Sequence, residues 1–147
     1  IDTASMQGRL GIPHAFGFGF SPPENGHGCW TDGDVCVLPF RSAAGVSRAQ
    51  VELRYRQMRG GPEWEHFDVE FVVEGRFCTP TQDEHRLESQ VYRRKTTFDM
   101  GQIAAPGGAA CLEGCVVLRF TGLLRGDPGG EKRKLGVLLT SFSISTN

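Results

Sequence analysis

The sequence predicts an all-β fold, a two-sheet antiparallel β-sandwich of the jelly-roll type. Apolar and polar residues alternate along several short runs, which is the pattern of half-buried strands. Clusters of glycine and proline separate these runs, and no long window shows helical periodicity. A chain of 147 residues fits one domain. We therefore expect about eight to ten strands, which a jelly roll accommodates.

Five segments are the strongest strand candidates, because they are rich in valine, leucine and phenylalanine or alternate in polarity. In the second, Val51, Leu53 and Tyr55 share one face, so we expect them in the core. Arg54 and Arg56 lie on the other face and are expected to point outward. In chain order the five segments are residues 35–40, 49–56, 65–73, 115–123 and 135–144.

The third and fifth segments carry further detail. Every second residue from Phe67 to Val73 is apolar, so these side chains are expected to point inward. In the last segment the alternation changes phase between Leu139 and Phe142. That change predicts either a β-bulge or a strand buried on both faces.

One helical turn is expected, at residues 81–87. Asp83 and Glu84 suit the first turn of a helix, because the N-terminal end of the helix dipole favours negative charge.

We expect residues 1–8 to be a leader, either vector-derived or disordered, and residues 9–147 to form the single β-sandwich domain. The chain begins with isoleucine, and Met6 follows a short stretch without a basic or apolar targeting pattern. No run of 18 apolar residues is present, so no membrane span is predicted. The formal net charge of −1 argues against a nucleic-acid partner.

The five cysteines form an odd set without the paired spacing of a zinc site. We expect free thiols in a reducing cytoplasm, with one or two disulfides or a metal site as the alternatives. The four histidines are scattered, so no metal and no cofactor are predicted. Glu24, Asp32 and Asp34 leave a structural calcium ion open as an alternative.

Two segments near the ends of the chain resemble a known family. Residues 17–37 read GFGFSPPENGHGCWTDGDVCV, and residues 131–144 read EKRKLGVLLTSFSI. They resemble the opening and closing motifs of β-sandwich modules attached to bacterial glycosyltransferases and other polysaccharide-biosynthesis proteins. The resemblance covers about a quarter of the chain and implies a carbohydrate-associated, non-catalytic module. Its expected partners are a polysaccharide or oligosaccharide, and a glycosyltransferase.

Sugar recognition uses an aromatic platform under the ring and planar polar side chains at the hydroxyl groups. Trp30 lies in the first motif beside Glu24, His27 and Asp32, and Trp64 stands where a loop meets a strand. These five residues are the candidate ligand-binding residues. For Trp30 the alternative is a core tryptophan whose indole N–H donates to the Glu24 carboxylate.

Two other functional classes remain as alternatives. The chain has neither a G-x-S-x-G nucleophile elbow nor a phosphate-binding P-loop, so no catalytic residues are predicted. An enzyme of another type is one alternative. The other is a structural domain for protein interaction or oligomerisation that positions a glycosyltransferase through a sheet face carrying Arg54 and Arg56.

Overall fold

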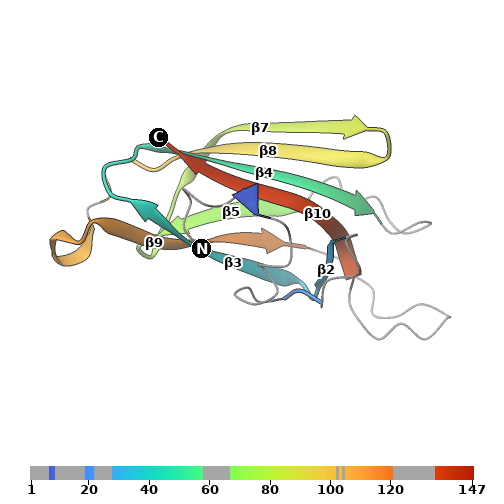
Figure 1. The fold of residues 1–147 in the computed structure, drawn as a ribbon, viewed down its shortest axis with the longest axis horizontal. Coiled ribbons are helices and arrows are strands. Elements are labelled where there is room, and N and C mark those ends of the chain that lie inside the picture. The colour runs from blue at the N-terminus through green and yellow to red at the C-terminus, as the bar shows by residue number, and fades with distance from the viewer. Residues whose placement is uncertain are drawn as a thin grey trace.

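Two antiparallel sheets pack against each other in the structure (Figure 1). The structure is a computed structural model, and it describes residues 7–8, 19–21, 28–57, 67–101, 103, 105–120 and 135–147. Within these ranges no helix has the length and apolarity needed to cross a bilayer.

The larger sheet, called here the large sheet, has six strands in the order β1-β10-β4-β8-β7, with β2 also paired to β10. The small sheet has the order β3-β9-β5-β6. The large-sheet strands are β1 (Gln7–Gly8), β2 (Cys29–Asp32), β4 (Arg48–Gln57), β7 (Thr79–Glu88), β8 (Val91–Asp99) and β10 (Leu135–Thr146). The small-sheet strands are β3 (Val35–Ala43), β5 (Asp68–Val73), β6 (Arg76–Phe77) and β9 (Cys111–Arg119), and a 3₁₀ turn, η1, spans Pro106–Gly108.

The strand order is that of a jelly roll, which confirms the predicted fold. β2, β10, β4 and β8 stand side by side in one sheet, and β3, β9, β5 and β6 in the other. Apart from the β5–β6 and β7–β8 hairpins, successive strands from β2 onward alternate between the sheets. β7 is an additional strand outside β8, where it forms the edge of the large sheet (Figure 1).

Within the described residues the predicted strands are confirmed with small changes of boundary, and residues 65–66 and 121–123 of the predicted segments lie outside the described residues. β9 begins at Cys111 rather than at residue 115. The inward faces of β4 and β5 are as expected, since Val51, Leu53 and Tyr55 are each 1% exposed and Phe71 is 0% exposed. In β10 the pairing with β4 shifts register between Leu139 and Ser141, which confirms a bulge at the predicted change of phase.

The predicted helical turn at residues 81–87 is wrong, because this segment belongs to strand β7. The chain reverses into β8 through Ser89 and Gln90, whose φ angles are 47° and 70°. Positive φ at both central residues is the geometry of a type I′ hairpin turn. All ten residues of β7 are exposed, so neither face imposes the alternation that identifies a buried strand.

Stacked aromatic rings hold the two sheets together. Phe71 of the small sheet stacks on Phe40 at 4.6 Å between ring centroids and on Phe98 of the large sheet at 5.2 Å. Phe67 stacks on Phe120 at 4.9 Å and meets Tyr55 of the large sheet edge-on at 5.2 Å. These contacts cross the interior and join both sheets in one core.

The two motif segments meet in the large sheet, since β2 pairs with β10. The hydroxyl oxygen of Thr31 accepts hydrogen bonds from the backbone N–H groups of Gly136 and Val137, at 3.2 and 2.9 Å. These two amides lie where the β2–β10 register shifts, so Thr31 provides an acceptor for N–H groups that the irregular ladder leaves unpaired. β1 also pairs with β10, so Gln7–Gly8, the end of the expected leader, is part of the sheet.

The five cysteines are free thiols. Cys29, Cys36 and Cys78 are buried, Cys115 is half-buried and Cys111 is exposed. Burial raises the pKa of Cys36 to about 12, and its thiol donates to the carbonyl oxygen of Gly19 at 3.0 Å.

These environments predict selective thiol chemistry. In the folded protein we expect iodoacetamide to modify Cys111 within a brief exposure and to leave Cys36 intact, because the thiolate is the reactive form and Cys36 is buried as a thiol. Peptide mass spectrometry after labelling, with and without denaturant, measures both sites. Equal labelling of the two cysteines in the native state would contradict the burial of Cys36.

Candidate functional site

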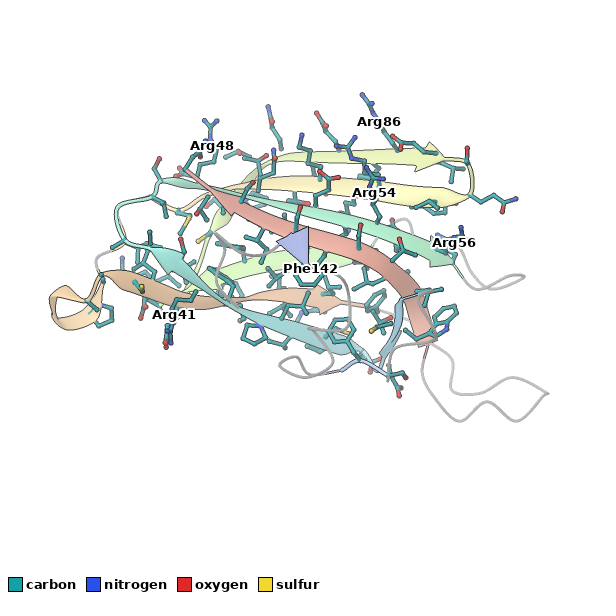
Figure 2. All side chains as sticks on the ribbon, viewed as in Figure 1. Arg41, Arg48, Arg54, Arg56, Arg86 and Phe142 are labelled. Carbon is teal, nitrogen blue, oxygen red and sulfur yellow. The ribbon has the colours of Figure 1, made fainter. Side chains whose placement is uncertain are left out.

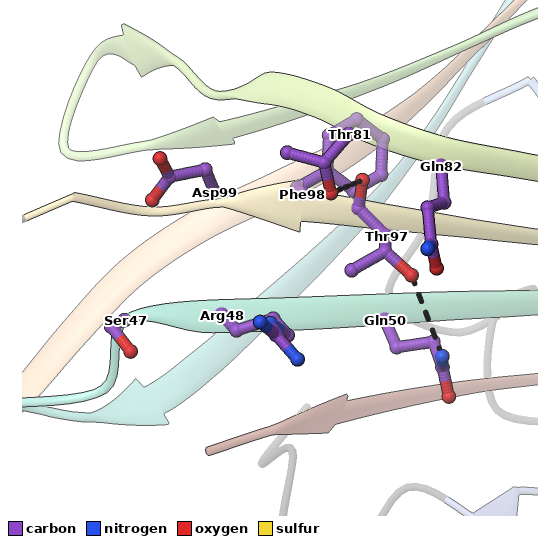
Figure 3. Close-up of a pocket in the computed structure, with 8 residues that line it drawn as sticks. All are labelled: Ser47, Arg48, Gln50, Thr81, Gln82, Thr97, Phe98 and Asp99. Atoms are coloured by element: carbon purple, nitrogen blue, oxygen red, sulfur yellow. Dashed lines mark hydrogen bonds between the residues drawn. The ribbon is translucent and has the colours of Figure 1, made fainter.

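A polar pocket of about 450 Å³ opens on the outer face of the large sheet, where β4, β8 and β7 lie side by side (Figure 3). We call it the outer-face pocket. Its volume falls within the range of roughly 300–1,000 Å³ found for small-molecule sites. It is lined by Ser47, Arg48, Gln50, Thr81, Gln82, Thr97, Phe98 and Asp99.

The centre of the pocket is a row of three side chains from three strands. Thr97 of β8 stands opposite Gln50 on β4 and opposite Gln82 on β7. The Gln50 side-chain amide donates to the Thr97 hydroxyl at 3.5 Å (Figure 3). Beside this row β7 bulges, since its register with β8 shifts between Pro80 and Gln82. The bulged residue is Thr81, whose hydroxyl donates to the Thr97 carbonyl oxygen at 3.3 Å.

Arg48 and Asp99 form the next row, directly opposite each other on β4 and β8. Both are exposed. Among the described residues no carboxylate lies within 4.0 Å of the Arg48 guanidinium, and one oxygen of Asp99 accepts from the backbone N–H of Gly101 at 2.9 Å. The pocket therefore offers a cationic donor, an anionic acceptor and two amides that can do both.

Further along the face the side chains bond to each other. Arg93 of β8 donates two hydrogen bonds to the Glu52 carboxylate, at 3.0 and 3.2 Å, and Arg54 lies 3.7 Å from the same carboxylate. The hydrogen bonds from Arg93 hold the pKa of Glu52 below its usual range. This part of the face is a closed ion network, in contrast to the open donors and acceptors of the pocket.

On the other side of Asp99 lies a second cavity, of about 240 Å³, which Asp99 borders together with Phe77. Phe77 is 72% exposed, the highest value among the large exposed apolar residues of the described chain. An exposed ring next to polar groups is the combination by which proteins hold the apolar face of a sugar.

The two predicted site residues that the structure describes, Trp30 and Asp32, do not line this pocket. Trp30 and Asp32 are partly exposed on β2, and Cys29 and Thr31, which alternate with them along the strand, are buried. Trp30 is opposite Leu138, which is itself opposite Arg56. Arg56 is eight residues along β4 from Arg48, so Trp30 stands at the opposite end of the face, roughly 26 Å along the strands.

Glu24, His27 and Trp64 lie outside the described residues. Trp30 is not among the core residues, so the core alternative for its side chain is not what the structure shows.

The pocket residues are not among the residues predicted from the sequence, for two reasons. Arg48 and Gln50 continue the outward phase of the β4 pattern, which could have marked them as surface residues. Gln82 lies in the segment predicted to form a helical turn, and only the strand pairing brings it beside Thr97. Phe77 is not one of the predicted aromatic platforms, which are the two tryptophans Trp30 and Trp64.

In the described part of the chain no three histidine, cysteine, aspartate or glutamate side chains gather as metal ligands. Comparisons with protein-family models, curated proteins and solved structures find no match for the chain.

Proposed function

We propose that the chain is a non-catalytic carbohydrate-binding domain that holds an oligosaccharide or polysaccharide in the outer-face pocket. The observation that carries this proposal is the set of open polar groups from Arg48, Gln50, Gln82 and Asp99 around one cavity. A sugar hydroxyl both donates and accepts hydrogen bonds, and planar amide, guanidinium and carboxylate groups match adjacent hydroxyls in pairs. The resemblance of residues 17–37 and 131–144 supports a setting in bacterial polysaccharide metabolism.

The pocket supports weak binding. The Phe98 ring is 1% exposed and stacks on Phe71 in the core, so it is not available to a ligand. Each hydrogen bond to a solvated ligand contributes a net ~0.5–1.5 kcal/mol. A glycan that also reaches past Asp99 to Phe77 gains an apolar contact, which favours a chain of sugars over a single ring.

A glycan array identifies a ligand, and calorimetry on variants then tests the pocket. We expect Arg48→Ala and Gln50→Ala each to weaken binding about tenfold, the equivalent of ~1.4 kcal/mol. Phe77→Ala is expected to weaken binding of longer oligosaccharides more than that of short ones.

Arg41→Ala is the matched control. Arg41 is an exposed arginine of β3, on the side of the sandwich away from Arg48 (Figure 2). We expect the Arg41→Ala variant to bind the glycan as tightly as the parent does. Loss of binding in Trp30→Ala with full binding in Arg48→Ala would place the site at the other end of the face and contradict the pocket. No binding across chemically diverse glycans would contradict the proposal itself and favour the protein-interaction alternative.

A further inference from the structure

We propose that β7 pairs with β7 of a second copy of this chain, antiparallel about a two-fold axis at His85, so that the large sheets of two copies become continuous. No described strand pairs with the outer edge of β7. An edge strand of this length is a template for further pairing, because it directs a row of backbone N–H and C=O groups away from its own sheet.

The hairpin geometry fixes which residues offer those groups. Glu88 and Val91 flank the two-residue turn and pair with each other. Hydrogen-bonded and non-hydrogen-bonded pairs alternate from there along the ladder. The backbone N–H and C=O groups of Glu84 and Arg86 are thus directed at β8, and those of His85 are directed away from it.

The length of the regular segment then selects a register. The bulge at Thr81 and the preceding Pro80 disrupt the first part of β7, and both are features that oppose pairing. The regular part runs from Gln82 to Glu88, and its middle residue is His85. Only a register centred on His85 lets this whole segment pair with its own copy.

The same register matches the charges. It places Glu84 of one copy opposite Arg86 of the other, and the two-fold axis creates this pair twice. Both residues lie on the outer face, in the phase of Gln82. They form a non-hydrogen-bonded pair, in which opposing side chains approach most closely. Moving the centre to Glu84 or to Arg86 would instead place like charges opposite each other, which is unfavourable.

The arrangement also bears on the proposed carbohydrate site. Antiparallel pairing in phase keeps the outer faces of both copies on the same side of the joined sheet, so two outer-face pockets would face one polysaccharide. Simultaneous engagement of two sites raises the apparent affinity of a weak site. This consequence rests on the proposed function, whereas the pairing itself does not.

Charge reversal tests the register directly, with sedimentation velocity of the 147-residue chain over a concentration series. The parent is expected to shift from monomer to dimer as concentration rises. E84R and R86E are each expected to remain monomeric, because each places like charges together at both pairs. An equimolar mixture of the two variants is expected to form a heterodimer, and the double variant E84R/R86E is expected to dimerise again.

Glu88→Arg is the control on the same strand, because Glu88 lies opposite the neutral Gln82 in this register, and it is expected to dimerise as the parent does. All three positions are exposed, and circular dichroism checks that each variant is folded. A monomeric parent at every concentration would overturn the proposal. Dimers of E84R and R86E as stable as those of the parent, or no recovery in the mixture, would also overturn it. None of these readouts uses a glycan, so failure here leaves the carbohydrate site to its own test.

Discussion

Replacing Gly114 by alanine is expected to destabilise the fold by about 3 kcal/mol, the upper part of the range for overpacked cores. A Cβ atom at this position of β9 would lie 2.2 Å from the carbonyl oxygen of Val72 and 2.7 Å from the ring of Phe40. The carbonyl belongs to the backbone of β5 and cannot rotate away. Phe40 is held in the aromatic stack with Phe71, so its displacement would disturb contacts between the sheets.

Thermal unfolding followed by circular dichroism measures this effect. Gly45→Ala is the comparison, because nothing lies within 4 Å of a Cβ at Gly45, although its φ of 83° strains any other residue. Backbone strain of that kind costs ~1–3 kcal/mol, so the Gly114 variant is expected to melt at the lower temperature. A Gly114 variant as stable as the Gly45 variant would show that the sheets accept the extra methyl group.

Asp83→Asn is expected to cost about 2 kcal/mol, because it leaves a buried arginine without its counter-charge. Arg94 is 7% exposed and donates to both Asp83 oxygens at 3.1 and 2.8 Å. It also donates to the Phe67 carbonyl oxygen and lies over the Phe67 ring, 4.9 Å from its centroid. Breaking a fully buried pair costs ~3–5 kcal/mol, and the partial exposure of Asp83 reduces that figure here.

Chemical denaturation measures the loss, with Glu52→Gln as the matched control. Glu52 also receives two hydrogen bonds from one arginine, Arg93, but that pair lies on the outer face with both side chains partly exposed. Pairs on the exposed surface contribute little to stability, so we expect the smaller loss for Glu52→Gln. Equal losses in the two variants would contradict the burial of Arg94.

The ion pair also predicts a dependence on pH. Partial burial alone would raise the pKa of Asp83, but the hydrogen bonds and charge of Arg94, with smaller effects of Thr96 and His85, together lower it. A lowered carboxyl pKa contributes stability that is present above the unfolded-state value of about 4 and is lost as pH falls through the folded-state value. The difference in stability between the parent and Asp83→Asn is therefore expected to shrink below about pH 4.

The sequence predicted the fold because alternation reports burial on one face. The patterns around Val51 and Phe71 belong to strands with one wet face, and both were located correctly. β7 was missed because it is an edge strand without an opposing sheet, so its residues carry no burial pattern. A positive φ at Ser89 and Gln90, neither of which is glycine, also concealed the hairpin turn.

The candidate site was harder to predict because it is a property of pairing rather than of any segment. Gln50, Thr97 and Gln82 lie far apart in the chain and meet only through the β4–β8–β7 register. The local sequence does not show which outward-facing residues of different strands become neighbours. The motif around Trp30 was the feature of the sequence that suggested a binding site. Part of its role is structural, because the Thr31 hydroxyl accepts hydrogen bonds from two backbone N–H groups of β10.

The most direct test of the central claim is a ¹H–¹⁵N NMR titration of the chain with a glycan selected on an array. We predict that the side-chain amide signals of Gln50 and Gln82, and the backbone amides of Thr97 and Asp99, shift in a saturable manner. The signal of the Trp30 indole N–H is expected not to shift. Shifts confined to Trp30, or to the small sheet, with no change around the outer-face pocket would contradict the assignment of that pocket as the carbohydrate site.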